Sequence, residues 1–443
     1  MNRRYMFHLI PVAALLLLVC VVSAFSIPQA GTDTQGFANG PDLQDSKAKD
    51  LGNKMAKAKN VILLIGDGMG YSELTAARWE KANESLATYA TTSLALDHLE
   101  YSGYVTTYCA DSFITDSAPA ATAIMAGVKT NLGVIGEDAT AVNKKSDGAR
   151  VASIAELAKR AGKATGAVTT TRITHATPAG LYAHVNDRDN ETLISSQLLA
   201  SGMDLAFGGG YPYFINATVK DPWGAKGKRT DGRDLIAEFR SAGYTVVNNS
   251  TGLAGVKARE GTKVLGLFSS SHMEYDRARN TTNEPSLAAM TGKALEILGK
   301  DKDGLFLMVE GGRIDHAGHA RDYANNTGDT LAFDAAVQTA LDFTKKNPDT
   351  LVIVTADHET GGLTLGATTN ANYAAGMSPY FPSGGNLTKD ANGTAIIALD
   401  PAEASHTAVD VPILASGPGA IEFGRGMIDN TEIFTRMKAA LRV

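Results

Sequence analysis

Residues 309–319, Val-Glu-Gly-Gly-Arg-Ile-Asp-His-Ala-Gly-His, hold two carboxylates and two imidazoles that could bind a metal ion. An apolar run at residues 305–308 comes directly before them and predicts a buried strand. Asp315 and His319 are four residues apart, so one helical turn would place both on one face, where they can chelate a divalent cation. A solvated surface helix could carry the same residues. Their position directly after a strand favours the metal site, because ligands of parallel α/β proteins bind beyond the carboxyl ends of strands.

Five further segments carry similar residues, and three of them add possible metal ligands. Gly-Asp-Gly at residues 66–68 would expose the Asp67 carboxylate in a sharp turn, although such a sequence is often only a turn. The spacing of these glycines matches neither a dinucleotide fingerprint nor a P-loop. Asp357 and His358 end an apolar run, and both are costly to bury unless they are paired or bind a metal. His406 precedes another predicted strand and is by itself weak evidence.

The other two segments could bind an anion. Ser117 opens a run of small residues, so a helix N-terminus would favour an anion near its hydroxyl, whereas the simpler interpretation is that Ser117 caps the helix. His175 and Thr177 are two residues apart and would point the same way in an extended chain. Arg188 could hold two phosphate oxygens with its guanidinium. His184 is interpreted as a structural histidine.

Together these segments are more specific than any one of them. The chain has nine histidines, and five of them lie in these segments: His175, His316, His319, His358 and His406. Several acids accompany them, and each segment adjoins a predicted strand. This combination predicts a site for several metal ions, with a serine and an arginine beside it. A structural zinc ribbon is not expected, because no segment contains a Cys-x-x-Cys pair.

The elements that must position these residues alternate along the chain. Apolar runs predict strands at residues 60–65, 104–108, 164–169, 244–247, 263–267, 305–309, 351–355 and 412–415. Helical periodicity falls between them, as at residues 152–161, 285–298 and 330–345. The alternation predicts an α/β fold: a single large domain at 59–443, with a mostly parallel central sheet sandwiched between helices. Residues 366–404 are rich in Gly, Asn, Pro and Ser and are expected to form an irregular, crown-type insertion.

The composition and the N-terminus suggest a secreted globular protein. Hydrophobic residues make up 44% and charged residues 20% of the chain, and the formal charge of −6 does not favour a nucleic-acid partner. Two arginines and an apolar run predict a signal peptide at residues 1–24, with an uncleaved membrane tether as the alternative. Residues 25–58 would form a leader, with a docking helix over 46–58.

Cysteine content agrees with this view of the mature chain. After removal of residues 1–24, Cys109 would be the one remaining cysteine, so no internal disulfide is expected. Cys109 is interpreted as a buried apolar filler. The protein is therefore expected in the periplasm, at the cell surface or outside the cell, stabilised by its core and by metals.

The order of the site segments resembles that of the alkaline phosphatase family. The matching motifs are Gly-Asp-Gly-Met-Gly, Thr-Asp-Ser-Ala, His-Ala-Thr-Pro-Ala, Val-Glu-Gly-Gly-Arg-Ile-Asp-His, Thr-Ala-Asp-His-Glu and Ser-His-Thr. The resemblance runs from about residue 60 to residue 415, most of the mature chain. The resemblance implies a homodimeric phosphomonoesterase that uses two Zn²⁺ and one Mg²⁺. It would hydrolyse phosphate monoesters to an alcohol and inorganic phosphate through a phosphoserine intermediate.

The resemblance also implies a role for each site residue. The ligands of the first zinc would be Asp315, His319 and His406. Those of the second zinc would be Asp67, Asp357 and His358, with Ser117 as the nucleophile at that metal. The third metal would be held by Asp67, Thr177 and Glu310. Arg188 would grip the phosphate of the substrate.

Two histidines depart from the best-known bacterial pattern, which has an aspartate and a lysine where this chain has His175 and His316. The animal enzymes resemble this chain at both positions. Two histidines add nitrogen donors near the third metal, so this site could hold Zn²⁺ or Co²⁺ instead of Mg²⁺. His316 would contact the substrate phosphate in place of a fixed positive charge.

Other functions remain open at this stage. A phosphodiesterase of the same superfamily is the nearest alternative, but Glu310, Thr177 and Arg188 together favour monoesters. A sulfatase is not favoured, because the arginine of the Cys/Ser-x-Pro-x-Arg motif is missing after Ser117. The second alternative is a secreted metal- or phosphate-binding protein without turnover.

Overall fold

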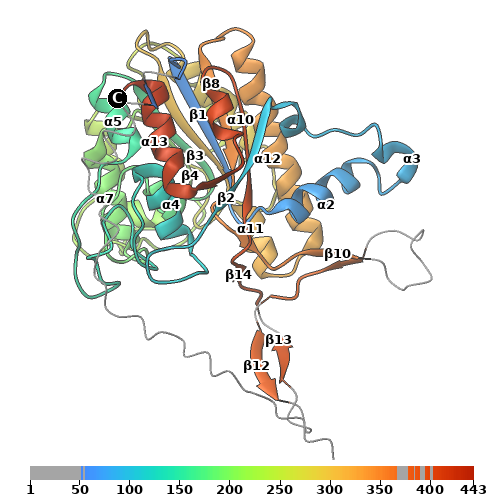
Figure 1. Ribbon diagram of the computed structural model, residues 1–443. Coiled ribbons are helices and arrows are strands. Elements are labelled where there is room, and N and C mark those ends of the chain that lie inside the picture. The colour runs from blue at the N-terminus through green and yellow to red at the C-terminus, as the bar shows by residue number, and fades with distance from the viewer. Residues whose placement is uncertain (1–50, 53–54, 367–377, 384, 390–394, 400–402) are drawn as a thin grey trace, which may run out of the picture.

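The computed structural model describes residues 51–52, 55–366, 378–383, 385–389, 395–399 and 403–443 (Figure 1). The predicted signal peptide at 1–24 lies outside the described residues, as does most of the leader at 25–58. At the end of that leader, Met55 and Ala58 are buried, and the Ala58 amide donates to the Ala440 carbonyl. Among the described residues no helix is long and apolar enough to cross a bilayer.

Ten strands form one central sheet, in the order β16-β2-β15-β8-β1-β7-β3-β4-β6-β5. Their bounds in that order are Met427–Asp429, Tyr101–Thr106, Val411–Ser416, Thr350–Thr355, Asn60–Gly66, Leu305–Gly311, Ala164–Arg172, Leu205–Gly209, Val264–Leu267 and Thr245–Val247. β15 runs antiparallel to β2 and β8, and every other pairing in this sheet is parallel. The strands β1, β7 and β8 are buried along their whole length, as continuous apolar runs in a parallel sheet require.

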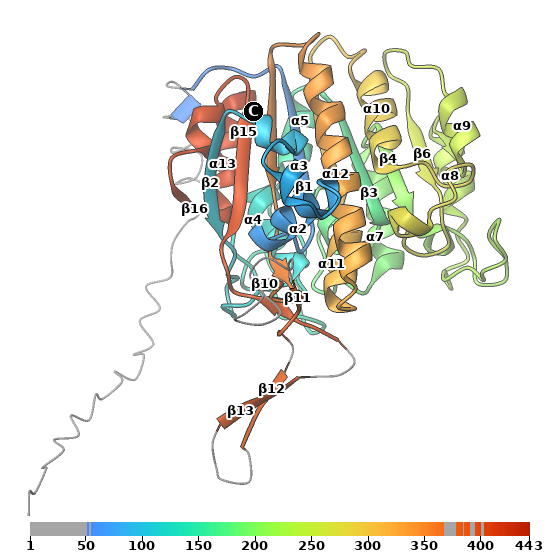
Figure 2. The same ribbon diagram turned by 90° about the vertical axis from the view of Figure 1, so that its right-hand side faces the viewer.

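Helices cover both faces of this sheet (Figures 1 and 2). α10 (Leu287–Leu298) and α12 (Tyr323–Thr344) pack on one face, while α5 (Ile154–Arg160) and α13 (Asn430–Leu441) pack on the other. The remaining α-helices are α2 Tyr71–Lys81, α3 Leu86–Tyr89, α4 Ser117–Ala126, α6 Ala176–Ala179, α7 Glu191–Ser201, α8 Leu235–Ser241, α9 Ser250–Gly255 and α11 Arg313–His319. Short 3₁₀ turns are η1 Ala95–His98, η2 Tyr211–Phe214, η3 Asp276–Ala278 and η4 Ala420–Phe423.

The predicted α/β fold with a mostly parallel sheet between helices is confirmed. Each of the eight predicted strands is present, but β4 and β16 were missed, because β4 is short and glycine-rich and β16 has only three residues. The helix predicted from residue 330 begins at Tyr323 instead. Asp322 caps it by accepting the Asn325 amide, and the first turns are polar, which hides them from a search for apolar periodicity.

Small strand pairs lie outside the main sheet. β9 (Glu359–Thr360) pairs with β14 (His406–Thr407), and the two strands run antiparallel to each other. Within and next to the predicted insertion, β10 (Thr364–Gly366) pairs with β11 (Ser378–Tyr380), and β12 (Gly385–Lys389) pairs with β13 (Ala395–Leu399). Figure 2 shows these two pairs extending away from the main sheet.

Cys109 is a free and buried thiol, as predicted. Burial raises its pKa to about 11, so it stays protonated and unreactive at neutral pH.

Candidate active site

The carboxyl ends of four neighbouring strands meet at one edge of the sheet, and each supplies a candidate residue. Asp67 directly follows β1, and Glu310 is the second-to-last residue of β7. His175 follows β3 by three residues, and Asp357 follows β8 by two. The parallel pairing of these strands therefore gathers side chains that lie up to 290 residues apart in sequence.

The expected ligands of the first metal come together. α11 places Asp315 and His319 on one face, as predicted, with His319 Nε2 at 3.4 Å from Asp315 Oδ1. The β9–β14 pairing brings in His406, whose Nε2 lies 3.5 Å from the same carboxylate oxygen and 3.1 Å from His319 Nε2. Burial opposes ionisation of Asp315, but the His319 and His406 imidazoles hold its pKa below the usual range.

The expected ligands of the second metal adjoin the first group. His358 Nε2 lies 3.2 Å from Asp357 Oδ2, 3.7 Å from Asp67 Oδ1 and 3.2 Å from Ser117 Oγ. The His358 ring stacks on the His406 ring with centroids 3.7 Å apart, so the first and second ligand groups are directly adjacent. Asp67 and Asp357 are completely buried, whereas the sequence suggested that Asp67 would be exposed.

Hydrogen bonds at the outer edge of the site orient two of these imidazoles. His319 Nδ1 lies 2.6 Å from the Ala404 carbonyl oxygen, and His406 Nδ1 lies 2.8 Å from the Thr115 carbonyl oxygen. A carbonyl can only accept, so each Nδ1 carries a proton, and in a neutral ring the lone pair is then on Nε2. In that neutral form the two Nε2 lone pairs face each other. This arrangement suits a cation bound by both rings.

Thr360 orients the third imidazole in the same sense. Its hydroxyl donates to Asp315 Oδ1 at 2.5 Å and lies 3.2 Å from His358 Nδ1. Because the hydroxyl proton is used on the carboxylate, the threonine oxygen accepts the Nδ1 proton of His358. The Nε2 lone pair of His358 then points toward Ser117 and the aspartates.

Ligand atoms of Asp67, His175 and Glu310 lie within 4.8 Å of one another and form a third group. Several buried atoms here have no hydrogen-bond partner within the described part of the chain, namely both oxygens of Asp67, Oε1 of Glu310, Nδ1 of His175 and Oγ1 of Thr177. Buried polar atoms are normally paired, so a cation is the natural partner for this set. Burial, aided by the nearby Asp357 carboxylate, raises the pKa of Asp67, and burial raises that of Glu310. A metal ion would restore their ionised forms.

The local structure around this third group differs from the expected extended chain. His175 is the N-cap residue of α6, and Thr177 lies inside that helix. Glu310 accepts hydrogen bonds from Thr169 and Thr171 of β3, neither of which was singled out from the sequence. The register of the two strands could have identified Thr169, because this residue is the direct β3 partner of Glu310.

Gly68 allows the first two groups to approach each other. Its φ of +72° is in the left-handed region, and a Cβ at this position would lie 2.8 Å from the Asp315 Cα atom. Glycine alone satisfies both conditions. The Gly68 amide also donates to Asp357 Oδ1 at 3.2 Å, which joins the end of β1 to the end of β8.

Ser117 begins α4 and is almost fully buried, but it does not cap the helix, so the capping interpretation is wrong. Asp116 is the cap, because its carboxylate accepts the Ala118 amide at 2.7 Å. The same carboxylate accepts Nη1 of Arg188 at 2.8 Å and the Gly133 amide at 2.7 Å. The Ser117 hydroxyl is consequently left facing His358, and the Arg188 guanidinium is held on the carboxylate of the preceding residue, Asp116.

His184 lies apart from the three groups. Its ring nitrogens contact the Gly136 carbonyl oxygen at 2.7 Å and Glu156 Oε1 at 3.1 Å. These contacts support its interpretation as a structural residue.

The imidazoles of His316 and of a second histidine, His272, which was not predicted, lie beside the third group. Burial lowers the pKa of His316 to about 4, so its ring is neutral at pH 7. Arg313 Nη1 lies 2.8 Å from His316 Nδ1, and because a guanidinium only donates, the proton of the neutral ring is on Nε2. The missed residue is His272, whose ring centroid lies 4.3 Å from that of His316 and 5.4 Å from that of His175. The one feature of the sequence that could have identified His272 as a site residue is its position shortly after the end of β6.

Comparisons with known proteins agree with this arrangement. A family model described as alkaline phosphatase matches residues 58–384. Alkaline phosphatase 3 of Bacillus subtilis is 35% identical over 90% of this chain and 92% of its own. Streptomycin-6-phosphate phosphatase of Streptomyces griseus is 37% identical over 87% of this chain and 91% of its own.

Among solved structures, alkaline phosphatase from the Antarctic bacterium TAB5 has a TM-score of 0.69 and 30% identity. The match covers 87% of this chain and 99% of that one. A histidine-to-aspartate variant of that enzyme has Mg bound in its M3 site. Since the family match spans most of the chain and full-length relatives exceed 30% identity, this protein belongs to the alkaline phosphatase family and is an enzyme with phosphomonoesterase activity.

Proposed function

We propose that this alkaline phosphatase transfers the phosphoryl group of its substrate to Ser117 and then to water, at a site that binds two Zn²⁺ and one Mg²⁺. One observation carries the proposal: imidazoles of three histidines adjoin buried carboxylate oxygens that have no hydrogen-bond partner among the described residues, and one of these imidazoles, His358, lies 3.2 Å from Ser117 Oγ. Neutral groups alone would leave these buried atoms unsatisfied.

The donor set fits the metals. Imidazole nitrogens and carboxylates in the first two groups are typical zinc ligands, whereas the mainly oxygen donors of the third suit magnesium. His175 adds one nitrogen there, so Zn²⁺ or Co²⁺ would also be accommodated. When bound, the zinc ions supply positive charge that lowers the pKa of the serine hydroxyl and stabilises the leaving oxygen.

The protein's own groups position and stabilise the reacting atoms. Ser117 Oγ would lose its proton and form a bond to phosphorus, while the bond to the alcohol oxygen breaks and that oxygen gains a proton. Water would then lose a proton and form the new bond to phosphorus as the bond from phosphorus to Ser117 Oγ breaks, and Ser117 Oγ would regain a proton. The positive end of the α4 dipole favours the negative charge that gathers beside Ser117.

Arg188 and His316 are proposed to hold the phosphate. Arg188 is aimed by Asp116, and His316 presents its Nε2 proton because Arg313 occupies Nδ1. Two donors on non-bridging oxygens favour a monoester, which has more free oxygens than a diester. The phosphodiesterase alternative would be supported if a diester with the same leaving group reacted faster than the monoester.

The test combines metal analysis with trapping of the intermediate. We expect about two zinc ions and a third ion per chain, and activity on 4-nitrophenyl phosphate that chelator removes and zinc restores. Acid quenching during turnover should yield a phosphorylated peptide containing Ser117. Full metal loading without that peptide or any product release would refute the proposal and favour a binding protein.

We also propose that the enzyme is exported and forms a homodimer. Export rests on the predicted signal peptide, and N-terminal sequencing of the purified protein should give a chain that begins at residue 25. Dimerisation is supported by an apolar surface at the β16 edge of the sheet, where Tyr71, Tyr104 and Met427 are 52%, 41% and 59% exposed.

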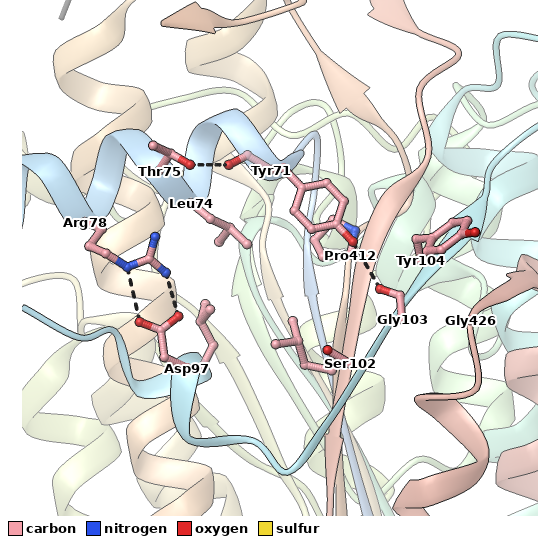
Figure 3. A pocket seen from close by; sticks show the side chains of 12 residues that line it. Tyr71, Leu74, Thr75, Arg78, Asp97, Ser102, Gly103, Tyr104, Pro412 and Gly426 are labelled. Carbon is pink, nitrogen blue, oxygen red and sulfur yellow. Dashed lines mark hydrogen bonds and ion pairs between the residues drawn. The ribbon is translucent and has the colours of Figure 1, made fainter. Parts of the chain in front are cut away.

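A pocket of about 380 Å³ lies within this surface, between α2 and the strands β2 and β15. Figure 3 shows the Tyr71 ring above Gly103 and the Arg78–Asp97 ion pair at the other end. No residue of the three ligand groups lines this pocket, so we assign it to the interface and not to catalysis.

A further inference from the structure

We propose that His175 makes the phosphate grip of Arg188 depend on the third metal, because His175 cannot both bind that metal and accept a hydrogen bond from Arg188. The inference rests on the proposed function, in which Asp67, His175 and Glu310 surround a cation.

The contact between the two side chains defines the starting state. Arg188 Nη2 lies 3.2 Å from His175 Nε2. A guanidinium has donors and no acceptor, so this ring nitrogen must hold a lone pair and the ring must be neutral, with its proton on Nδ1. Nδ1 itself is buried and has no hydrogen-bond partner among the residues that the structure describes. One arginine nitrogen is therefore engaged by the ring before any substrate binds.

Metal binding changes what the ring can offer. A neutral imidazole has one nitrogen lone pair available, and coordination by either nitrogen uses it. The other nitrogen then carries the proton. If that nitrogen is Nε2, it presents an N–H to the N–H of Arg188; if Nε2 itself binds the metal, no lone pair remains for the arginine. In both cases Arg188 Nη2 is released.

The released guanidinium stays in place to bind phosphate. Its Nη1 remains on Asp116 Oδ1 at 2.8 Å, and Asp116 is itself held by the amides of Ala118 and Gly133. The Arg188 amide also donates to the Gly133 carbonyl at 2.9 Å. Arg188 can thus turn about a fixed point, and Nη2 becomes free for a phosphate oxygen.

The test measures the affinity for inorganic phosphate at two fixed metal states. Calorimetry would use the full chain with two equivalents of zinc, with the third site empty or filled by added Mg²⁺. With the third site empty, His175→Ala should tighten phosphate binding several-fold to about tenfold, because Arg188 no longer has a competing acceptor. His184→Ala is the matched control: it removes a histidine that lies apart from the three groups, with its ring on Gly136 and Glu156 instead of Arg188, and it should leave that affinity unchanged.

A second, reciprocal measurement tests the inference even if the His175→Ala variant fails to fold. If Arg188 competes with the metal for the His175 lone pair, Arg188→Met should strengthen Mg²⁺ binding at the third site about tenfold. Arg172→Met controls for the loss of a nearby positive charge, because Arg172 donates to Glu191 and His272 instead. Its effect on Mg²⁺ affinity should be clearly smaller.

The outcomes separate the two ideas. Unchanged or weaker phosphate binding by His175→Ala, or equal effects of Arg188→Met and Arg172→Met, would overturn the inference and leave the proposed function standing. Failure of the wild-type enzyme to bind phosphate in either metal state would refute both.

Discussion

Replacing Thr360 with valine would test how the proposed zinc ligands are oriented. Thr360 is completely buried and joins the first two ligand groups, since its hydroxyl donates to Asp315 and accepts from His358. Valine has nearly the same shape but neither interaction. The substitution leaves a buried carboxylate oxygen and a buried imidazole N–H without partners, with little change in packing.

The expected magnitude follows from these two bonds. A hydrogen bond to a carboxylate contributes about 1.5–3 kcal/mol and one between neutral groups about 0.5–1.5 kcal/mol, so unfolding of the metal-free protein should become easier by about 2–4 kcal/mol. Losing an outer partner of a metal ligand typically weakens metal binding about 10–100-fold. We therefore expect activity to fall at limiting zinc and to recover substantially when zinc is in excess.

Urea unfolding of the metal-free protein and zinc titration against a competing chelator measure these two effects. Thr360→Ser is the matched control, because serine keeps the hydroxyl, and it should retain most of the zinc affinity. If Thr360→Val bound zinc within about threefold of the wild type and unfolded at the same urea concentration, the orienting role of this hydroxyl would be wrong.

Four further predictions concern the nucleophile, the first metal, pH and assembly. Ser117→Ala should lower turnover by at least about a thousandfold and abolish the phosphorylated peptide while metal content stays near normal; near-normal turnover would disprove the nucleophile assignment. His406→Ala should reduce bound zinc from about two ions per chain to about one in elemental analysis, and full occupancy at wild-type rate would contradict its role as a ligand. Burial raises the pKa of Asp329 to about 7, so the folded protein keeps a proton that the unfolded chain releases near pH 4; stability therefore falls as pH rises between these values, and Asp329→Asn should reduce that fall in urea unfolding at pH 5 and pH 8. Met427→Asp at the apolar edge should shift the enzyme from dimer to monomer in light scattering, with an unchanged wild-type mass in the variant arguing against this interface.

Local pattern was sufficient for much of the fold. Continuous apolar runs such as residues 305–309 are typical of strands that are buried on both faces of a parallel sheet covered by helices, and the structure has β7 at that place. The Asp315–His319 spacing likewise places both residues on one face of any helix, and α11 does so. Such features depend on neighbours a few residues away, so they can be read from the chain itself.

Interactions between residues that are far apart in the sequence could not be predicted in this way. His272 joins His175 and His316 only because β6, β3 and β7 lie in one sheet. Asp116 and not Ser117 caps α4, and it does so while accepting Arg188 from 72 positions away. Sequence propensity treats both residues as good caps and cannot choose between them.

The kinds of side chain in the candidate site, their order and the strands that carry them could be predicted from the chain, because side-chain chemistry and short-range periodicity are properties of consecutive residues. The orientation of those side chains follows from the packing of distant segments. The carbonyls of Ala404 and Thr115 and the hydroxyl of Thr360 contact the Nδ1 atoms of three histidines, and one of the opposite nitrogens, Nε2 of His358, lies 3.2 Å from Ser117 Oγ. Backbone carbonyls carry no sequence signal, and their positions are set by packing across the whole sheet.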